Sequence, residues 1–155
     1  MKSILIVCTG NICRSPMAEG ILKRILSEKN LNNIQVWSAG ISAGSGYPAS
    51  LNAIAVMAER GIDITSHQSQ PITGPLISES DLILVMEEYH RDDILNFFPA
   101  EAGKVHLLKE YDIDTVSLMD IQDPMGGAIA AYRFCAEEIK RCLLNFVSEY
   151  FEGRK

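Results

Sequence analysis

Residues 2–16 read KSILIVCTGNICRSP, and this stretch contains the parts of a strand–turn–helix unit. The run over 2–7 is short, apolar and rich in β-branched residues, which predicts a buried strand. A polar turn with a glycine follows it. Pro16 then opens a stretch over 16–29 with apolar residues at helical spacing, and proline is tolerated in the first turn of a helix. The turn therefore lies where the first strand ends and the first helix begins.

The same alternation continues along the rest of the chain. Further strands are predicted at 34–39, 82–85 and 105–108, and further helices at 50–60, 87–98 and 128–151. Loops are expected over 40–48 and 65–75, and a long acidic connection over 109–127 holds Asp112, Asp114, Asp120 and Asp123. Strands that alternate with helices predict a mostly parallel sheet with helices on both faces. Ligands bind such sheets beyond the carboxyl ends of the strands, and the first of these ends is at Cys8.

The composition is that of an ordinary globular protein. The chain has 155 residues, of which 47% are hydrophobic and 22% charged, so we expect a single domain over residues 1–155. The net charge of −6 argues against a nucleic-acid partner, which usually meets a basic surface. No apolar run approaches ~20 residues, so no membrane span is expected. The apolar start is too short for an export signal, and we expect the protein in the cytoplasm.

Two further features draw attention to the first thirty residues. Disulfides are not the default in a reducing cytoplasm, so a catalytic or metal-binding role is worth testing for the cysteines, which are Cys8, Cys13, Cys135 and Cys142. Residues 1–30 carry five basic and two acidic side chains, whereas the remaining residues carry nine and eighteen. Chance accounts for this asymmetry as well as an anion site near the first strand does.

The turn after the first strand has the residue types of an oxyanion site. Gly10 and Asn11 permit a backbone conformation that turns successive N–H groups inward as an anion nest. The helix start at Ser15 and Pro16 adds free N–H groups that attract phosphate. Arg14 adds a planar guanidinium that is suited to contact two phosphate oxygens.

Cys8 lies at the start of this turn. A helix N-terminus and an arginine both favour the thiolate form of a nearby cysteine. A thiolate that faces a bound phosphoryl group is a nucleophile, and the hydroxyl of Ser15 can donate a hydrogen bond to the sulfur. The turn therefore predicts phosphoryl transfer through a cysteinyl phosphate.

Three other interpretations of the turn fit less well. A nucleotide-binding loop needs Gly-x4-Gly-Lys-Ser/Thr, and the matching positions here are Cys8-x4-Cys13-Arg14-Ser15. A zinc site through Cys8 and Cys13 lacks a second close pair of ligands, since the histidines lie far apart at positions 67, 90 and 106. A cysteine that only fills the core leaves the glycine, asparagine, arginine and serine around it unexplained.

The stretch CTGNICRSPMAE, residues 8–19, resembles the signature loop of the low-molecular-weight protein tyrosine phosphatases, including their Cys-x5-Arg core. The resemblance continues through residues 38–40, His67 and the pair Asp123-Pro124, and it spans essentially the whole chain. It implies a single-domain α/β fold of the flavodoxin-like or Rossmann-like type, with four parallel strands in the order 2-1-3-4. It also implies hydrolysis of phosphate monoesters without a metal or another cofactor.

The resemblance assigns catalytic roles to individual residues. Cys8 attacks phosphorus, Arg14 stabilises the transferred group and Ser15 stabilises the thiolate. The phosphate is bound by Thr9, Gly10, Asn11, Ile12, Cys13, Arg14 and Ser15. Asp123 donates a proton to the leaving group and then activates the water that hydrolyses the intermediate. Without the resemblance, nothing selects Asp123 among the 20 acidic residues.

Other positions match residues with supporting roles. Asn11, Ser38 and His67, together with Ser15, correspond to positions that hydrogen-bond to one another and hold the loop in shape. Cys13 corresponds to a second loop cysteine that traps Cys8 as a reversible disulfide under oxidation.

The expected substrate pocket departs from the usual pattern of the family. Aromatic walls usually follow the Asp-Pro pair, where this chain has Met125-Gly126-Gly127. The pocket residues are then Ile12, Tyr47 and Met125, and the apolar contact of Ile12 with an aromatic ring favours phosphotyrosine. The two glycines resemble the protein-arginine phosphatase branch, which typically carries threonine in place of Ile12. Phosphoarginine therefore stays open as the alternative substrate.

Two further activities are less compatible with the sequence. Arsenate reduction on this fold needs a relay of further cysteines, but Cys135 and Cys142 are separated along a helix by about 10.5 Å, too far for a disulfide. A silent phosphate-binding module does not account for Cys8, Arg14 and Asp123 together. The expected partner is a phosphorylated protein, either the substrate of a tyrosine or arginine kinase or the kinase itself. The protein is expected to be a monomer.

Overall fold

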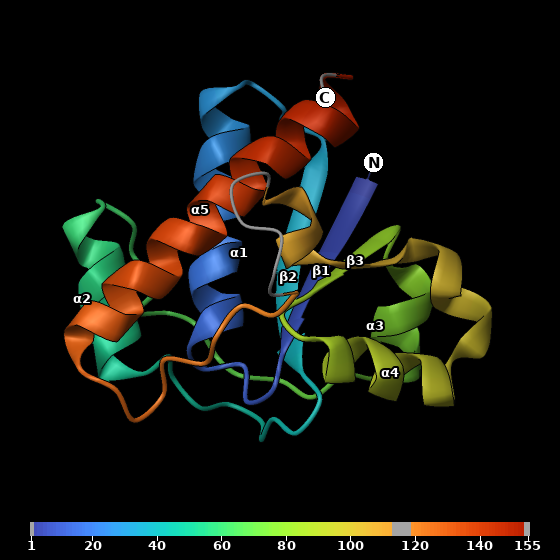
Figure 1. Ribbon diagram of the computed structural model, residues 1–155, viewed down its shortest axis with the longest axis horizontal. Helices are drawn as coiled ribbons and strands as arrows, with labels where there is room; N and C mark the ends of the chain where they lie inside the picture. Colours follow the sequence, from blue (N-terminus) through green and yellow to red (C-terminus); the bar gives the residue numbers. More distant parts are fainter. Residues whose placement is uncertain (1, 113–118, 154–155) are drawn as a thin grey trace.

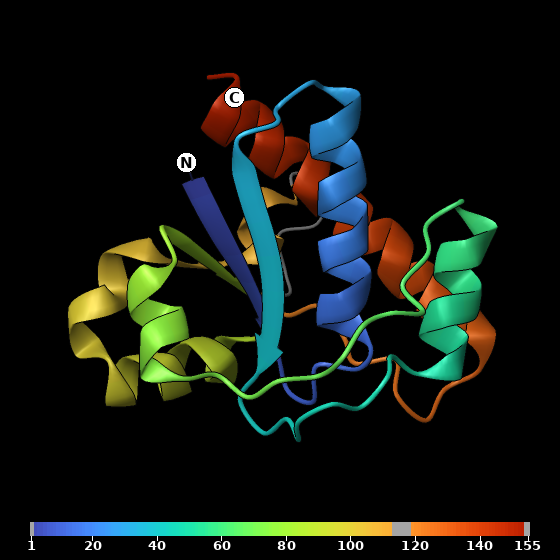
Figure 2. The ribbon, with the colours of Figure 1, turned by 180° about the vertical axis from the view of Figure 1, so that it is seen from behind.

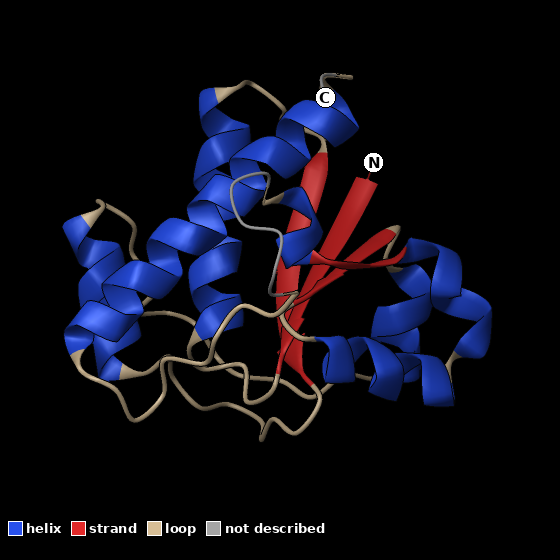
Figure 3. Cartoon of the chain, in the orientation of Figure 1, coloured by secondary structure: helices blue, strands red, loops and turns tan. Residues whose placement is uncertain are grey.

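Four parallel strands form the sheet of the computed structural model, which describes residues 2–112 and 119–153 (Figures 1 and 3). The strands are β1 (Lys2–Cys8), β2 (Ile34–Gly40), β3 (Leu82–Val85) and β4 (Val105–Leu107). Their order in the sheet is β2-β1-β3-β4, and every pairing is parallel. The predicted α/β fold and strand order are confirmed.

Helices cover both faces of this sheet (Figures 1 and 2). The helices are α1 (Arg14–Glu28), α2 (Leu51–Glu59), α3 (Gly74–Glu79), α4 (Glu88–Phe97) and α5 (Ile129–Phe151), with the 3-10 turns η1 (Pro99–Lys104) and η2 (Leu108–Tyr111). Successive side chains of β1 point to opposite faces, so Ile4 and Ile6 pack toward α1, α2 and α5. Leu5 and Val7 pack toward α3 and α4 on the other face. The central strand is therefore buried on both sides.

The structure differs from the sequence prediction at α3, at the start of α1 and at the 3-10 turns η1 and η2, which were not expected. α3 lies partly in the segment 65–75, which was expected to be irregular. Thr73 caps this helix by accepting a hydrogen bond from the backbone N–H of Leu76 at 3.2 Å, and Pro75 occupies its first turn. A proline after a threonine thus marks a helix start here and not a break. α1 begins at Arg14, two residues before the predicted start, and Asp114 of the acidic connection lies outside the described residues.

The carboxyl ends of β1, β2 and β3 meet at one edge of the sheet. Cys8 is in register with Gly40 of β2, and Val7 is in register with Val85 of β3. The start of β1 and the end of α5 lie at the opposite edge in Figure 1. The loops that follow β1, β2 and β3 therefore gather where ligands bind in sheets of this type. Within the described residues, the helices do not combine the length and apolar character needed to cross a membrane.

Candidate active site

The loop after β1, residues 8–15, turns its carbonyl groups outward; we call it the phosphate loop. The carbonyls of Cys8, Thr9, Asn11 and Ile12 accept hydrogen bonds of 2.7–3.0 Å, from Ile41, Ser42, His67 and Ser50 respectively. A trans peptide points its C=O and the following N–H in opposite directions. The N–H groups after these carbonyls therefore face the centre of the loop, which is the arrangement of an anion nest.

Asn11 supplies the backbone turn that this shape requires. Its φ is +57°, in the left-handed region that asparagine tolerates better than most residues. Gly10 was expected to share this role, but its φ is not positive, and a Cβ added there would meet Ile12 at an ordinary 3.8 Å. The expectation for Gly10 was therefore wrong, because the single residue Asn11 makes the turn.

The side chain of Asn11 also organises the polar groups behind the nucleophile. It is fully buried; its Nδ2 donates to Ser15 Oγ at 2.8 Å and to Ser38 Oγ at 3.0 Å, and its Oδ1 accepts from the Gln70 N–H at 2.9 Å. Together with the bond from His67 to the Asn11 carbonyl, these contacts bring together the four residues that were expected to support the loop.

The direction of these hydrogen bonds can be followed to the nucleophile. Ser38 donates its proton to Glu19 Oε1 at 2.6 Å, so its oxygen is free to accept from Asn11. Ser15 also accepts from Asn11 and is left with its own proton, which points to Cys8 Sγ at 2.9 Å. A hydroxyl that donates to sulfur stabilises the thiolate form. Glu19 completes this chain, a role that the sequence alone did not reveal.

Arg14 extends below the phosphate loop and is only 1% exposed. Its Nη1 donates to Glu87 Oε2 and to the Ile121 carbonyl, both at 2.8 Å, and its Nη2 donates to Thr9 Oγ1 at 3.3 Å. Burial opposes the charge, but the nearby Cys8, Glu87 and Asp123 outweigh burial and raise the pKa of the guanidinium. Arg14 is therefore a fixed cation beside the nucleophile.

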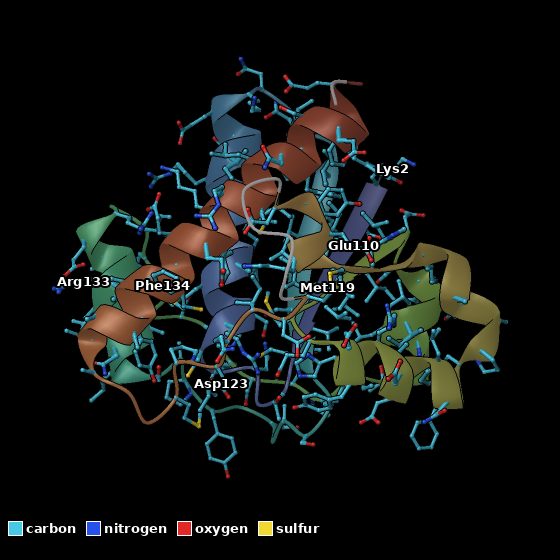
Figure 4. All side chains as sticks on the ribbon, viewed as in Figure 1. Lys2, Glu110, Met119, Asp123, Arg133 and Phe134 are labelled. Carbon is cyan, nitrogen blue, oxygen red and sulfur yellow. The ribbon has the colours of Figure 1, made fainter. Side chains whose placement is uncertain are left out.

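Asp123 approaches the same place from the connection before α5 (Figure 4). Its Oδ2 lies 3.6 Å from Arg14 Nη2, and its side chain is 44% exposed. The segment is anchored two residues earlier, where the N–H of Ile121 donates to the Met86 carbonyl at 2.8 Å and the Ile121 carbonyl accepts from Arg14. The carboxylate therefore stands at the mouth of the site, in reach of both solvent and substrate.

The comparison with protein families agrees with this geometry. The family model described as "Low molecular weight phosphotyrosine protein phosphatase" matches residues 3–153. The chain belongs to this family. The signature residues that carry the resemblance in the sequence are the same ones that the structure gathers around Cys8.

Relatives within the low-molecular-weight phosphatase family carry two kinds of name. "Probable low molecular weight protein-tyrosine-phosphatase EpsP" of Ralstonia nicotianae is 44% identical over 141 residues, which cover 91% of this chain and 90% of the relative. A "Protein-arginine-phosphatase" of Bacillus subtilis is 37% identical over 152 residues, covering 98% of this chain and 99% of the relative. A solved structure of a Cys-to-Ser mutant of the YwlE arginine phosphatase with a phosphorylated active-site serine is 35% identical, with a TM-score of 0.88; it covers 98% of this chain and 97% of that chain.

The hollow of this phosphatase lies directly over the phosphate loop. Its lining consists of Cys8, Gly10, Ile12, Cys13, Arg14, Asp123 and Met125. Tyr47 was expected to line it too, but the structure does not place it there. Its ring lies over Gly44, where an added Cβ would come within 2.5 Å of Cε2, and the residue is 62% exposed. Wider hollows lie beside α1 and α2, but neither brings a cysteine and an arginine together.

The other cysteines of this phosphatase differ in their access to the site. Cys13 lines the hollow and lies 3.4 Å from Ser50 Oγ and 3.6 Å from the Tyr132 hydroxyl, and burial raises the pKa of its thiol. Cys135 and Cys142 are buried on α5, and burial raises the pKa of each to about 12. All four thiols are free, and the disulfide between Cys8 and Cys13 stays a prediction.

Sequence reasoning missed the residues that contact Arg14 and Thr9 from behind the phosphate loop. Glu87, Tyr89 and His90 follow β3, and by sequence they belong to the polar start of a helix. One signal could have found them, because β3 lies beside β1 and their carboxyl ends share an edge. Charged residues directly after such a strand are placed to reach the same ligand.

Proposed function

We propose that the protein hydrolyses phosphotyrosine in a phosphorylated protein through a cysteinyl-phosphate intermediate. The convergence of Cys8, Arg14 and Asp123 on one small hollow carries this proposal. These three residues supply a nucleophile, a fixed cation and an acid. Cys8 and Arg14 belong to the phosphate loop, whereas Asp123 comes from the connection before α5, so the fold brings the acid to the other two.

The first step transfers the phosphoryl group to sulfur. The thiolate of Cys8 forms an S–P bond while the bond from phosphorus to the tyrosine oxygen breaks. The protonated carboxyl of Asp123 gives its proton to that departing oxygen. Arg14 and the inward N–H groups of the phosphate loop hold the phosphoryl oxygens and stabilise the charge that they carry in the transition state.

The second step returns the enzyme to its starting state. The carboxylate of Asp123 accepts a proton from a water molecule, whose oxygen forms a bond to phosphorus as the S–P bond breaks. Inorganic phosphate leaves, and the hydroxyl of Ser15, 2.9 Å from Sγ, stabilises the released thiolate. The phosphorylated active-site serine in the Cys-to-Ser mutant of the YwlE relative supports a covalent intermediate at this position.

The apolar part of the hollow favours an aromatic substrate. Ile12 and Met125 lie in the lining beside Cys8, and Met125 is 53% exposed, so both can contact the ring of a phosphotyrosine. The EpsP relative, at 44% identity, is named a tyrosine phosphatase. Phosphoarginine is the second candidate, because the Bacillus subtilis relative named an arginine phosphatase matches nearly the whole chain.

Replacement of the nucleophile and the acid tests the mechanism. Cys8→Ser should abolish hydrolysis of p-nitrophenyl phosphate and of a phosphotyrosine peptide. Asp123→Asn should slow hydrolysis of the peptide, which has the poorer leaving group, by about 100-fold or more. It should slow hydrolysis of p-nitrophenyl phosphate less. Steady-state kinetics with both substrates measures this difference. Activity that persists in Cys8→Ser would contradict the covalent mechanism.

A comparison of two peptides tests whether phosphotyrosine or phosphoarginine is the preferred substrate. We expect a higher kcat/KM for a phosphotyrosine peptide than for a phosphoarginine peptide of the same flanking sequence. Ile12→Thr should shift the ratio toward phosphoarginine, since the hydroxyl replaces an apolar contact with a polar one. A preference of the unmodified protein for phosphoarginine would overturn the assignment to phosphotyrosine and establish the alternative.

We also propose a monomer in the cytoplasm whose partner is a kinase substrate or the kinase itself. A cysteine nucleophile works only as a free thiol, which a reducing compartment maintains. Sedimentation of the purified protein tests whether it is a monomer, and fractionation of its host cells tests whether it lies in the cytoplasm. Capture of phosphoproteins by the Cys8→Ser variant tests the partner, because a variant that binds but does not turn over retains its substrate.

A further inference from the structure

A buried histidine lies behind Arg14, and the chemistry described above does not use it. His90 is fully buried in the first turn of α4. Its two ring nitrogens contact two groups on opposite sides. Nδ1 lies 3.0 Å from the backbone nitrogen of Glu87, and Nε2 lies 2.9 Å from Thr9 Oγ1 in the phosphate loop.

These contacts fix the position of the proton on the ring. The backbone N–H of Glu87 can only donate, so Nδ1 of His90 must be the acceptor. The proton of the neutral ring is then on Nε2, which donates to Thr9 Oγ1. An imidazolium does not fit this arrangement, because it would direct a second N–H against the N–H of Glu87.

The proton on Nε2 in turn fixes the hydroxyl of Thr9. Its oxygen accepts from His90 and also from Arg14 Nη2 at 3.3 Å, so both lone pairs are occupied. The hydroxyl proton must point elsewhere, and Thr9 Oγ1 also contacts the hydroxyl of Tyr89. Thr9 therefore presents a lone pair to Arg14. Glu87 and the Ile121 carbonyl hold the other end of the guanidinium, at Nη1.

Burial and the positive charge of Arg14 favour the same neutral state. Burial and the nearby Arg14 lower the pKa of His90 from 6.5 to about 3. The titratable and charged groups that face it are Arg14 below the phosphate loop, Glu87 with Oε2 at 3.7 Å, and the ring of Tyr89 at 4.3 Å. The ring is thus a neutral hydrogen-bond donor over the whole pH range in which such an enzyme works.

We propose that His90 is a positioning residue of this phosphatase, which orients Arg14 for the phosphoryl group through the hydroxyl of Thr9. The inference rests on the phosphatase function proposed above. Without the donor at Nε2, the hydroxyl of Thr9 is free to rotate and to turn its proton toward the guanidinium. Arg14 then loses one of the three acceptors that hold its plane, and its alignment with the phosphoryl oxygens is less well defined.

Two amides separate this role from a purely structural one. In His90→Asn, the amide oxygen occupies the place of Nδ1 and keeps the bond from Glu87, but nothing reaches Thr9. In His90→Gln, the amide nitrogen occupies the place of Nε2 and reaches Thr9, while the bond from Glu87 is lost. We expect His90→Asn to lower kcat/KM for p-nitrophenyl phosphate about tenfold and to weaken competitive inhibition by inorganic phosphate. His90→Gln should stay within about threefold of the unmodified enzyme.

The opposite ranking of the two variants would overturn the proposal, because a structural role in capping α4 favours asparagine.

A double-mutant cycle gives a second test. In a Thr9→Val background the hydroxyl is absent, so the addition of His90→Asn should lower kcat/KM little further. An equal loss of kcat/KM in both backgrounds contradicts the inference. Thermal melting of each variant identifies loss of folding, and Thr9→Val alone still tests the acceptor if the His90 variants do not fold. If the unmodified protein hydrolyses no substrate, the proposed function fails, and the phosphate-binding constants still test the positioning.

Discussion

The protonation of one side chain links the active site to the acid stability of the protein. The pKa of His90 is about 3 in the folded protein, against an ordinary value of 6.5 in the unfolded chain. Between these two values the unfolded chain binds a proton that the folded protein does not. The contribution of His90 to stability is therefore complete above pH 6.5 and declines as the pH falls toward 3.

His90→Gln should remove this dependence. Between pH 6.5 and 4.5 the unmodified protein should lose about 2 kcal/mol more unfolding free energy than the variant. Urea denaturation at the two pH values measures the difference. Equal losses in the unmodified protein and in His90→Gln would contradict the buried neutral histidine.

At the level of residues, sequence reasoning could group functional candidates where they form a local pattern. Cys8, Asn11, Arg14 and Ser15 lie within one short turn, so their chemistry could be inferred together. Glu87 and His90 leave no such pattern, because they follow a different strand and lie more than 70 residues from the phosphate loop. Their contacts with Arg14 and Thr9 follow from the neighbouring position of β3 and β1, which only the folded sheet reveals.

Among the elements, the end of β2 determines how closely the phosphate loop can pack. An added Cβ at Gly40 would come within 2.5 Å of the Thr9 carbonyl oxygen and 3.0 Å of the Asn11 nitrogen. Both are backbone atoms of the phosphate loop and cannot move independently of it. The absence of a side chain at Gly40 is therefore a condition for the shape of the anion nest.

Gly40→Ala should disturb the active site from outside it. We expect a loss of about 1–3 kcal/mol in unfolding free energy, together with a lower kcat and weaker binding of inorganic phosphate. Gly103→Ala is the control, since an added Cβ there meets nothing within 4 Å. Denaturation and steady-state kinetics of the two variants provide the measurement. If Gly40→Ala behaves like Gly103→Ala, the packing argument is wrong.

The elements themselves were predictable where apolar periodicity is strong. The strand at 82–85 has the predicted bounds, and the long closing helix differs by one residue at its start. α3 was missed because it is six residues long and too short to show a helical repeat. The 3-10 turns η1 and η2 were missed for the same reason, since their short runs carry no periodic signal.

The charge of the whole molecule acts on the approach of the substrate. The net charge is −6, although the phosphate loop itself is a site for an anion. A phosphopeptide therefore meets a field that repels acidic flanks and attracts basic ones before it reaches Arg14. The overall field therefore favours positively charged flanks, whereas the phosphate loop binds the negatively charged phosphate.

Phosphotyrosine peptides with lysine flanks should accordingly have a severalfold higher kcat/KM than peptides with glutamate flanks. The difference should shrink as salt rises past ~0.15 M, where the screening length falls to about 8 Å. Kinetics at several salt concentrations, with a peptide of neutral flanks as the reference, tests this prediction. A preference that does not change with salt would indicate direct contacts with the flanks instead of the overall field.

The bond from Arg14 to the Ile121 carbonyl joins residues that are 107 positions apart in the sequence. During synthesis on the ribosome, the phosphate loop emerges long before the segment that carries Asp123, and α5 must still follow to pack against α1. A nascent chain therefore has its nucleophile without its acid. We therefore expect the full rate of hydrolysis only after the segment that carries Asp123 has joined the folded sheet.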